Sequence, residues 1–107
     1  MNVIETPVFT RQIQAIMSDE EYRALQNTLI ANPSTGKLIP GSGGLRKLRW
    51  KASGRGKRGG SRVIYYWFTK RDALLMLLAY KKQEQKDLTP QQTQALRTLI
   101  TQELKDG

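Results

Sequence analysis

The sequence predicts an α+β domain in which two helices come first, a small antiparallel sheet lies in the middle and one helix closes the chain. A length of 107 residues suits one hydrophobic core and is short for two. Helix-start signals stand near both ends of the chain. The stretch between them alternates, or is rich in β-branched and aromatic residues, as strands are. We therefore expect residues 1–107 to form a single domain.

The first helix is predicted over residues 7 to about 17. Thr6 places a hydroxyl cap directly before Pro7. Proline suits the first helical position because the amide hydrogen that it lacks would have no partner there. The Thr-Pro pair therefore marks where this helix begins.

The second helix is predicted over residues 19 to about 31. Ser18 and Glu21 form a capping box, in which each side chain can bond to the other residue's amide. The helix ends before Pro33 because the residue preceding a proline avoids helical dihedral angles. The turn-rich residues 34–44 that follow are interpreted as an ordered surface loop.

A strand is predicted over residues 45–51, where polar and apolar side chains alternate. Leu48 and Trp50 fall on one face of it. The other face is cationic and carries Lys47, Arg49 and Lys51. This cationic face is the first indication of a binding surface.

Two further strands are predicted over residues 62–68 and 73–80, joined by a turn at residues 70–72. We expect them to pair as an antiparallel hairpin with the helices covering one side. The last helix is predicted from Thr89 and Pro90 to about residue 104, with the same type of cap as the first. Its apolar stripe consists of Leu96, Leu99, Ile100 and Leu104.

The charge of the chain is strongly positive and locally concentrated. Eighteen Lys and Arg against nine Asp and Glu give a net charge of +9, which favours polyanionic partners. Residues 22–71 hold twelve of these cations and no carboxylate. The cationic face is therefore expected to have no acid that offsets it.

Several classes of site and location are excluded or disfavoured. The chain has no cysteine, which excludes disulfides and thiolate metal sites, and no histidine, the usual proton carrier near neutral pH. We expect no metal and no other cofactor. No signal-peptide pattern and no apolar run long enough for a membrane span is found. A cytoplasmic protein without membrane contact is the expectation.

The basic, Gly-rich residues 51–60 allow two interpretations. They could form a solvated loop that only keeps the protein soluble, as charge runs usually do. The alternative is a phosphate-binding surface that continues onto the cationic strand, since arginine forks match phosphate oxygens. The sequence GRGKRGGS lacks the P-loop spacing, which favours a polynucleotide over a mononucleotide. The predicted RNA-binding or ribosome-binding cations are Arg46, Lys51, Arg55, Lys57 and Arg58.

RNA cleavage without histidine would need other groups for its three roles. A lysine crowded by cations has its pKa lowered and can act as a base, while arginine stabilises negative charge in the transition state. Lys47, Arg49 and Arg62 would form such a set if their strands are adjacent. Three tyrosines could donate protons or stack on bases, namely Tyr65, Tyr66 and Tyr80. Core packing is the expected role of at least two of them.

The order of these motifs is similar to that of a known family. Two N-terminal helices are followed by GGLRKLRW, GKRGGSR, VIYYW and YKKQEQKDLT, and then by a helix. From about residue 22 to residue 104 the chain resembles the RelE/HigB superfamily of bacterial type II toxins, in particular its HigB-like branch. The resemblance implies a twisted, mainly antiparallel sheet with helices packed on one side.

The resemblance also implies an activity and partners. Toxins of this superfamily cleave mRNA in the ribosomal A site by metal-independent attack of the 2′-hydroxyl, which leaves a 2′,3′-cyclic phosphate. An antitoxin, expected to carry a helix-turn-helix domain, holds the toxin inactive and connects it to operator DNA. The implied partners are therefore mRNA, the ribosome with its rRNA, and this antitoxin.

The catalytic residues that the resemblance implies are Lys47, Arg49, Arg62 and Lys82. Two positions depart from the best-studied branch, because Gln83 stands at an arginine position and Thr89 at a tyrosine position. Lys57 or Arg58 would then have to compensate.

Three functions follow in order of preference. The first is a ribosome-dependent endoribonuclease toxin. The second is a non-catalytic RNA-binding or ribosome-binding module that uses the same basic face. The third is an interaction protein whose basic groove receives an acidic partner peptide.

Overall fold

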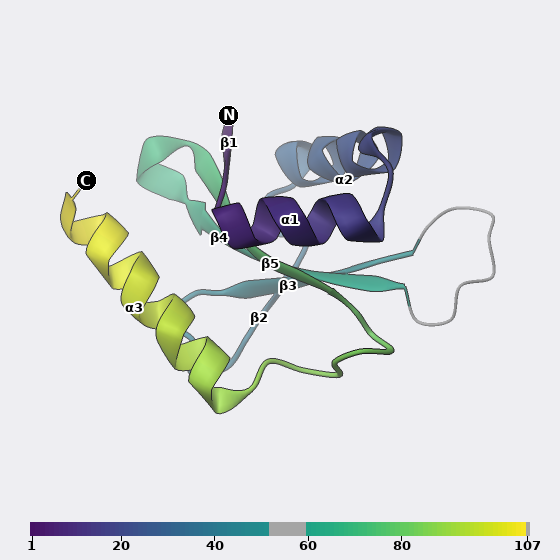
Figure 1. The fold of residues 1–107 in the computed structure, drawn as a ribbon. Helices are drawn as coiled ribbons and strands as arrows, with labels where there is room; N and C mark the ends of the chain where they lie inside the picture. Colours follow the sequence, from purple (N-terminus) through teal and green to yellow (C-terminus); the bar gives the residue numbers. More distant parts are fainter. Residues whose placement is uncertain (52–59, 107) are drawn as a thin grey trace.

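The computed structural model of the protein describes residues 1–51 and 60–106. Within them the fold is α+β, with three α-helices and a five-stranded mixed sheet (Figure 1). The sheet order is β1-β5-β4-β3-β2. The elements in chain order are β1 (Asn2–Glu5), α1 (Pro7–Ile16), α2 (Asp19–Ala31), β2 (Lys37–Leu38), β3 (Arg46–Trp50), β4 (Ser61–Phe68), the 3₁₀ turn η1 (Thr69–Arg71), β5 (Ala73–Lys81) and α3 (Pro90–Asp106).

The predicted helix starts are confirmed. Thr6, Ser18 and Thr89 each accept a hydrogen bond through the side chain from the amide three residues later, at 3.0–3.1 Å. At the start of α3 the capping box is reciprocal, because Gln92 Oε1 also accepts from the Thr89 amide at 3.0 Å. These caps satisfy amides that have no partner inside a helix.

The strands that carry the site also follow the prediction. β4 pairs with β5 and β3 pairs with β4, both antiparallel. The β4–β5 ladder shifts register between Ile64 and Tyr65, which marks a bulge or irregularity. The three strands form the centre of the sheet.

Two strands were not predicted. β1 lies parallel to β5, with Asn2 opposite Ala73, and its first amide donates to the carbonyl of Asp72 at 3.1 Å. A parallel neighbour so distant along the chain leaves no local pattern in a four-residue segment. β2 is only two residues long and lies inside the turn-rich segment that was interpreted as a loop.

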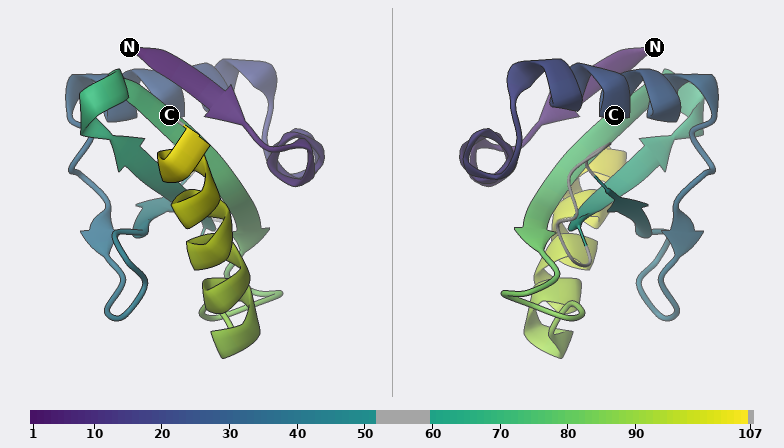
Figure 2. Two further views of the ribbon diagram at one scale, coloured as in Figure 1. Left: turned by 90° about the vertical axis from the view of Figure 1, so that its left-hand side faces the viewer. Right: turned by 90° about the vertical axis from the view of Figure 1, so that its right-hand side faces the viewer.

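The expectation that all helices cover one side of the sheet is wrong. Val63 and Tyr65 of β4 pack with α1 and α2, whereas Ile64 packs with α3 on the opposite face. Figure 2 shows α3 on one side of the sheet and α2 on the other. β4 and β5 are buried on both faces, which explains their nearly continuous apolar sequences.

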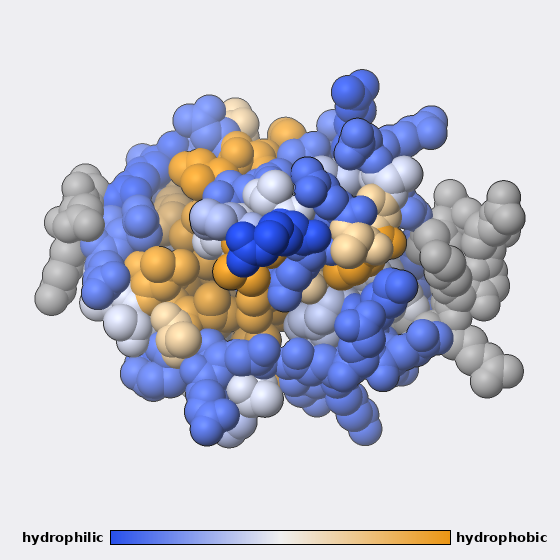
Figure 3. All heavy atoms as spheres, in the orientation of Figure 1, coloured by the Kyte–Doolittle hydropathy of each residue, from blue (hydrophilic) through white to orange (hydrophobic). Residues whose placement is uncertain are grey.

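Apolar side chains are exposed on both sides of the sheet, since Ile30 of α2 is 43% exposed. Figure 3 shows apolar side chains at the surface beside α3. Leu104, near the end of this helix, is 53% exposed. Among the described residues, no helix combines the length and the apolar character that a membrane span requires.

Candidate functional site

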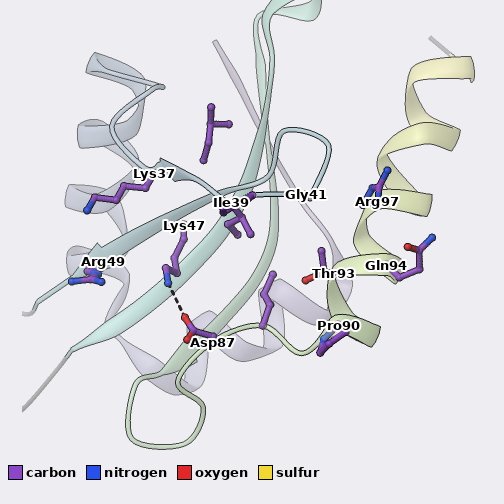
Figure 4. A pocket seen from close by; sticks show the side chains of 13 residues that line it. Lys37, Ile39, Gly41, Lys47, Arg49, Asp87, Pro90, Thr93, Gln94 and Arg97 are labelled. Atoms are coloured by element: carbon purple, nitrogen blue, oxygen red, sulfur yellow. Dashed lines mark hydrogen bonds and ion pairs between the residues drawn. The ribbon is translucent and has the colours of Figure 1, made fainter.

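A groove of about 550 Å³ lies between the β2–β3 side of the sheet and the first half of α3 (Figure 4). The sheet contributes three cations, and the helix contributes polar side chains. The polar residues that line the groove are Lys37, Lys47, Arg49, Asp87, Thr93, Gln94 and Arg97. A groove with this lining can bind an anion on one wall and offer hydrogen bonds from the other.

The alternation of β3 places two of these cations. Leu48 is buried and packs in the core with α1 and α2, so Lys47 and Arg49 point to the α3 side. Lys37 of β2 is directly opposite Lys47 and therefore shares its face. The predicted cationic face of this strand is confirmed, and it gains Lys37 from the neighbouring strand.

Arg46 lies on the other face of β3. Its guanidinium donates to the carbonyl oxygens of Ser34 (3.2 Å) and Gly36 (2.8 Å). The loop before β2 is thereby tied to the sheet. The structure thus gives Arg46 an architectural contact on the face away from the groove, whereas an RNA-binding role was expected for it.

An acid does offset the cationic face, contrary to expectation. The Asp87 carboxylate accepts a hydrogen bond from Lys47 Nζ at 3.0 Å, and the two groups form an ion pair (Figure 4). This hydrogen bond, and then the Lys47 charge, hold the pKa of Asp87 below its usual value. Asp87 lies forty residues along the chain from Lys47 and reaches the groove through the segment between β5 and α3.

Arg62 occupies the centre of a row across three strands. It is paired with Arg49 of β3 and with Tyr80 of β5, so all three lie on the α3 face of the sheet. The prediction that Lys47, Arg49 and Arg62 come from adjacent strands is therefore confirmed. Arg62 is only 6% exposed, and its guanidinium donates to the Ser61 carbonyl at 3.2 Å. It lies beside the groove and does not line it.

Two of the three tyrosines are core residues, as expected. Tyr65 is fully buried, donates to the Pro33 carbonyl at 2.6 Å and accepts from the Gly36 amide at 2.9 Å. Tyr80 is 7% exposed, and burial raises the pKa of its hydroxyl. Asp87 raises the same pKa further and Arg62 lowers it, so Tyr80 is electrostatically coupled to the site. Tyr66 is half-buried against the α3 core.

The remaining predicted residues lie elsewhere. Lys82 follows β5 with an exposed side chain outside the groove lining, and its amide donates to the Gly60 carbonyl at 3.2 Å. Lys51 is exposed directly after β3. Arg55, Lys57 and Arg58, which were expected to bind RNA, lie outside the described residues.

Several groove residues were missed by the sequence analysis: Lys37, Asp87, Thr93, Gln94 and Arg97. Asp87 belongs to the DLT sequence that contributed to the family resemblance, and this was the available signal. The α3 residues lie on the polar face of a helix whose partner could not be identified from periodicity. Their place in the site follows from packing between distant segments.

One family model and two solved structures similar to this chain all belong to RelE toxins. A family model described as the RelE toxin of the RelE/RelB toxin–antitoxin system matches residues 1–106. A chain of the intact E. coli RelBE toxin–antitoxin complex superimposes with a TM-score of 0.58 at 13% identity, covering 75% of this chain and 94% of that one. A mutant of E. coli toxin RelE in the free state gives a TM-score of 0.54 at 12% identity, covering 79% and 86%. At such identities these two structures show a shared fold.

Proposed function

Since the chain belongs to the RelE toxin family of toxin–antitoxin systems, we propose that it is a ribosome-dependent endoribonuclease that cleaves translated mRNA in the A site. The observation that supports this most is the row of Arg49 and Arg62 on adjacent strands, next to the Lys47–Asp87 pair. The positive charges of such a cluster can stabilise a negatively charged phosphodiester, and its lysine and carboxylate can exchange protons with the RNA. Inhibition of translation and of growth would follow from the cleavage.

The proposed reaction is attack by the neighbouring 2′-oxygen on the phosphorus atom. The 2′-hydroxyl loses its proton, the new P–O2′ bond forms and the P–O5′ bond breaks, which leaves a 2′,3′-cyclic phosphate and a 5′-hydroxyl. Arg49, which is exposed at the groove, would contact the non-bridging phosphate oxygens. Arg62 would add its charge from the buried position beside it.

The proton transfers are assigned to the Lys47–Asp87 pair. Asp87 is ionised at neutral pH like other aspartates, and Lys47 lowers its pKa further, so a carboxylate is present that can accept the 2′-proton. The Lys47 ammonium can deliver a proton to the departing 5′-oxygen. Transfer of the proton from Asp87 to Lys47 across their 3.0 Å contact would then restore both groups. Because an acid with a lowered pKa is a weak base, we assign most of the rate to charge stabilisation by arginine.

The proposed partners follow from the family. The RelBE structure is a toxin–antitoxin complex, and we infer that this chain also has an antitoxin. We propose that this antitoxin carries a helix-turn-helix domain and connects the toxin to operator DNA. The toxin would act in the cytoplasm, where ribosomes translate mRNA.

The test uses an arginine that can be removed without disturbing the core. Arg49→Ala deletes an exposed side chain, whereas Arg62→Ala would leave a cavity at a position that is 6% exposed. We expect Arg49→Ala to lower cleavage by about a hundredfold, the effect of losing one donor to a transition-state oxyanion. The matched control is Arg23→Ala, an exposed arginine on α2. Growth after induction and primer extension on translated mRNA are the readouts.

A second candidate is a non-catalytic RNA-binding or ribosome-binding module. It is favoured by the position of Lys82 outside the groove and by the engagement of Lys47 with Asp87. Such a module would arrest translation without creating new 5′ ends on mRNA. New 5′ ends in the wild type that disappear in Arg49→Ala would support the nuclease, and arrest without them would support the module.

A further inference from the structure

The two walls of the groove differ in chemistry. The sheet wall carries three cations, whereas the helix wall carries one, a guanidinium, next to an amide and a hydroxyl from α3 (Figure 4). We propose that the helix wall binds the base of a nucleotide next to the cleaved phosphodiester, and that Gln94 and Arg97 determine which base is preferred. This inference rests on the proposed function, because it assigns base selectivity to the same groove.

Gln94 and Arg97 are not needed to attach the helix to the sheet. α3 packs through Leu96 and Ile100, which are 9% and 3% exposed. Gln94 and Arg97 are exposed and three residues apart, so their side chains are neighbours on the helix surface. They form a pair of polar groups that faces the groove without a role in the core.

The hydrogen-bonding groups of this pair are unused within the described part of the chain. Apart from the backbone bonds of the helix, the hydrogen bonds that the structure shows for these two residues are made to their backbone carbonyls, by the hydroxyls of Thr98 (3.0 Å) and Thr101 (2.9 Å). The Gln94 amide and the Arg97 guanidinium thus keep their donors and acceptors for a ligand. Glutamine can form paired hydrogen bonds with an adenine edge, and arginine with a guanine edge.

The Arg97 side chain also lies near the loop before β3. A Cβ atom added at Gly43 would lie at ordinary van der Waals distance from this side chain, 3.6 Å from its Nε and 3.9 Å from its Cγ, so the loop before β3 passes near it. Gly43 has a φ of +78°, a conformation that suits glycine. The lack of a side chain at Gly43 therefore leaves room for the arginine beside this loop.

Apolar side chains lie between the two walls. Ile39 and Leu88 are half-buried in the groove lining, and Pro40 is exposed beside them. Apolar surface of this type can support the flat face of an unstacked base whose edge is read by polar groups. The volume of about 550 Å³ is within the range of small-molecule sites. The groove thus combines phosphate, base-face and base-edge contacts.

The experiment compares mRNAs that differ at one nucleotide beside a mapped cut, in a translating extract containing the wild-type or variant toxin. The readout is the ratio of cleavage between the matched mRNAs, so overall rate cancels. We expect Gln94→Ala or Arg97→Ala to reduce the wild-type preference by about five- to tenfold, the lower part of the range for one paired base contact. Gln102→Ala on the same helix and Arg23→Ala on α2 are the controls, which should keep the wild-type ratio.

Each outcome is decisive. A changed ratio with Gln94→Ala or Arg97→Ala, and an unchanged ratio with both controls, supports the inference. Cleavage that falls equally on all mRNAs, or an unchanged ratio in both variants, overturns it while leaving the nuclease function intact. If the wild type cuts no mRNA at any position, the proposed function itself fails, and this inference fails with it.

Discussion

The Glu5 carboxylate joins three elements through two short hydrogen bonds. It accepts from the hydroxyl of Tyr22 on α2 and from that of Thr10 on α1, both at 2.6 Å. Tyr22→Phe removes one of these donors from a partly buried carboxylate. We expect the free energy of unfolding to fall by about 1–2 kcal/mol, measured by urea denaturation. Tyr66→Phe, at a half-buried tyrosine on the other face, should change it by less than about 0.5 kcal/mol. Equal effects in the two variants would contradict this account.

The same tyrosine makes stability depend on alkaline pH. Burial, followed by the bond to Glu5, raises the pKa of Tyr22 above its ordinary value of 10.0. Above that pH the unfolded chain releases a proton that the folded protein retains. The contribution of Tyr22 to the free energy of unfolding is therefore fully present below about pH 10 and is lost as the pH rises further. Urea midpoints of the wild type should therefore decline more steeply than those of Tyr22→Phe between about pH 9 and pH 11. Parallel curves would show that Tyr22 does not titrate differently on folding.

Single residues also show what the sequence could and could not predict about the site. The alternation in residues 45–51 was sufficient to place Lys47 and Arg49 on one face, because a strand has a fixed period of two. Asp87 could not be placed beside Lys47, since this contact depends on the path of the chain after β5. The site was therefore predictable where it rests on strand geometry and not where it rests on tertiary packing.

At the scale of elements, the junction of β3, β4 and β5 depends on Gly60. Its φ is +59°, and a Cβ at this position would overlap the carbonyl oxygen of Trp50. We expect Gly60→Ala to destabilise the protein by about 2 kcal/mol or more, because strain and a backbone clash add together. Arg49 near the end of β3 and Arg62 near the start of β4 lie next to this junction, so toxicity should fall as well.

Gly41→Ala is the matched control for this prediction. Gly41 has a similar φ of +69°, but nothing lies within 4 Å of the added Cβ. Only the conformational cost of about 1 kcal/mol should then appear. If thermal or urea unfolding shows the same loss for both variants, the clash with Trp50 is not important.

The elements themselves were predicted unequally. Helix ends were correct to within one or two residues because caps and prolines are local signals. β1 was missed because its partner in the described sheet is β5, some seventy residues later. The two-sided covering of the sheet was missed for a related reason. The apolar runs of β4 and β5 indicate burial, but they do not indicate from which side each helix arrives.

At the scale of the whole molecule, the net charge of +9 should make RNA binding sensitive to salt. Each phosphate that a cation neutralises on a single strand contributes about −0.7 to the slope of log affinity against log salt. Arg49→Ala should therefore reduce the magnitude of this slope by about 0.7, whereas Arg23→Ala should not change it. A titration with 2′-O-methyl RNA, which has no free 2′-hydroxyl to attack, measures this without cleavage. An unchanged slope in Arg49→Ala would remove Arg49 from the RNA contact.

The contact between Lys47 and Asp87 gives the molecule a counterion of its own. RNA that enters the groove meets a lysine whose charge is already balanced by a carboxylate, so Lys47 attracts a phosphate less strongly than Arg49 does. Few solution ions are released when a phosphate binds at Lys47. Lowering the salt concentration therefore strengthens phosphate binding less at Lys47 than at Arg49. A single free phosphate therefore gains little at this pair, whereas a polymer is held by the neighbouring cations and leaves the contact between Lys47 and Asp87 in place. The groove is thus suited to distinguish a long RNA from the small anions that surround it.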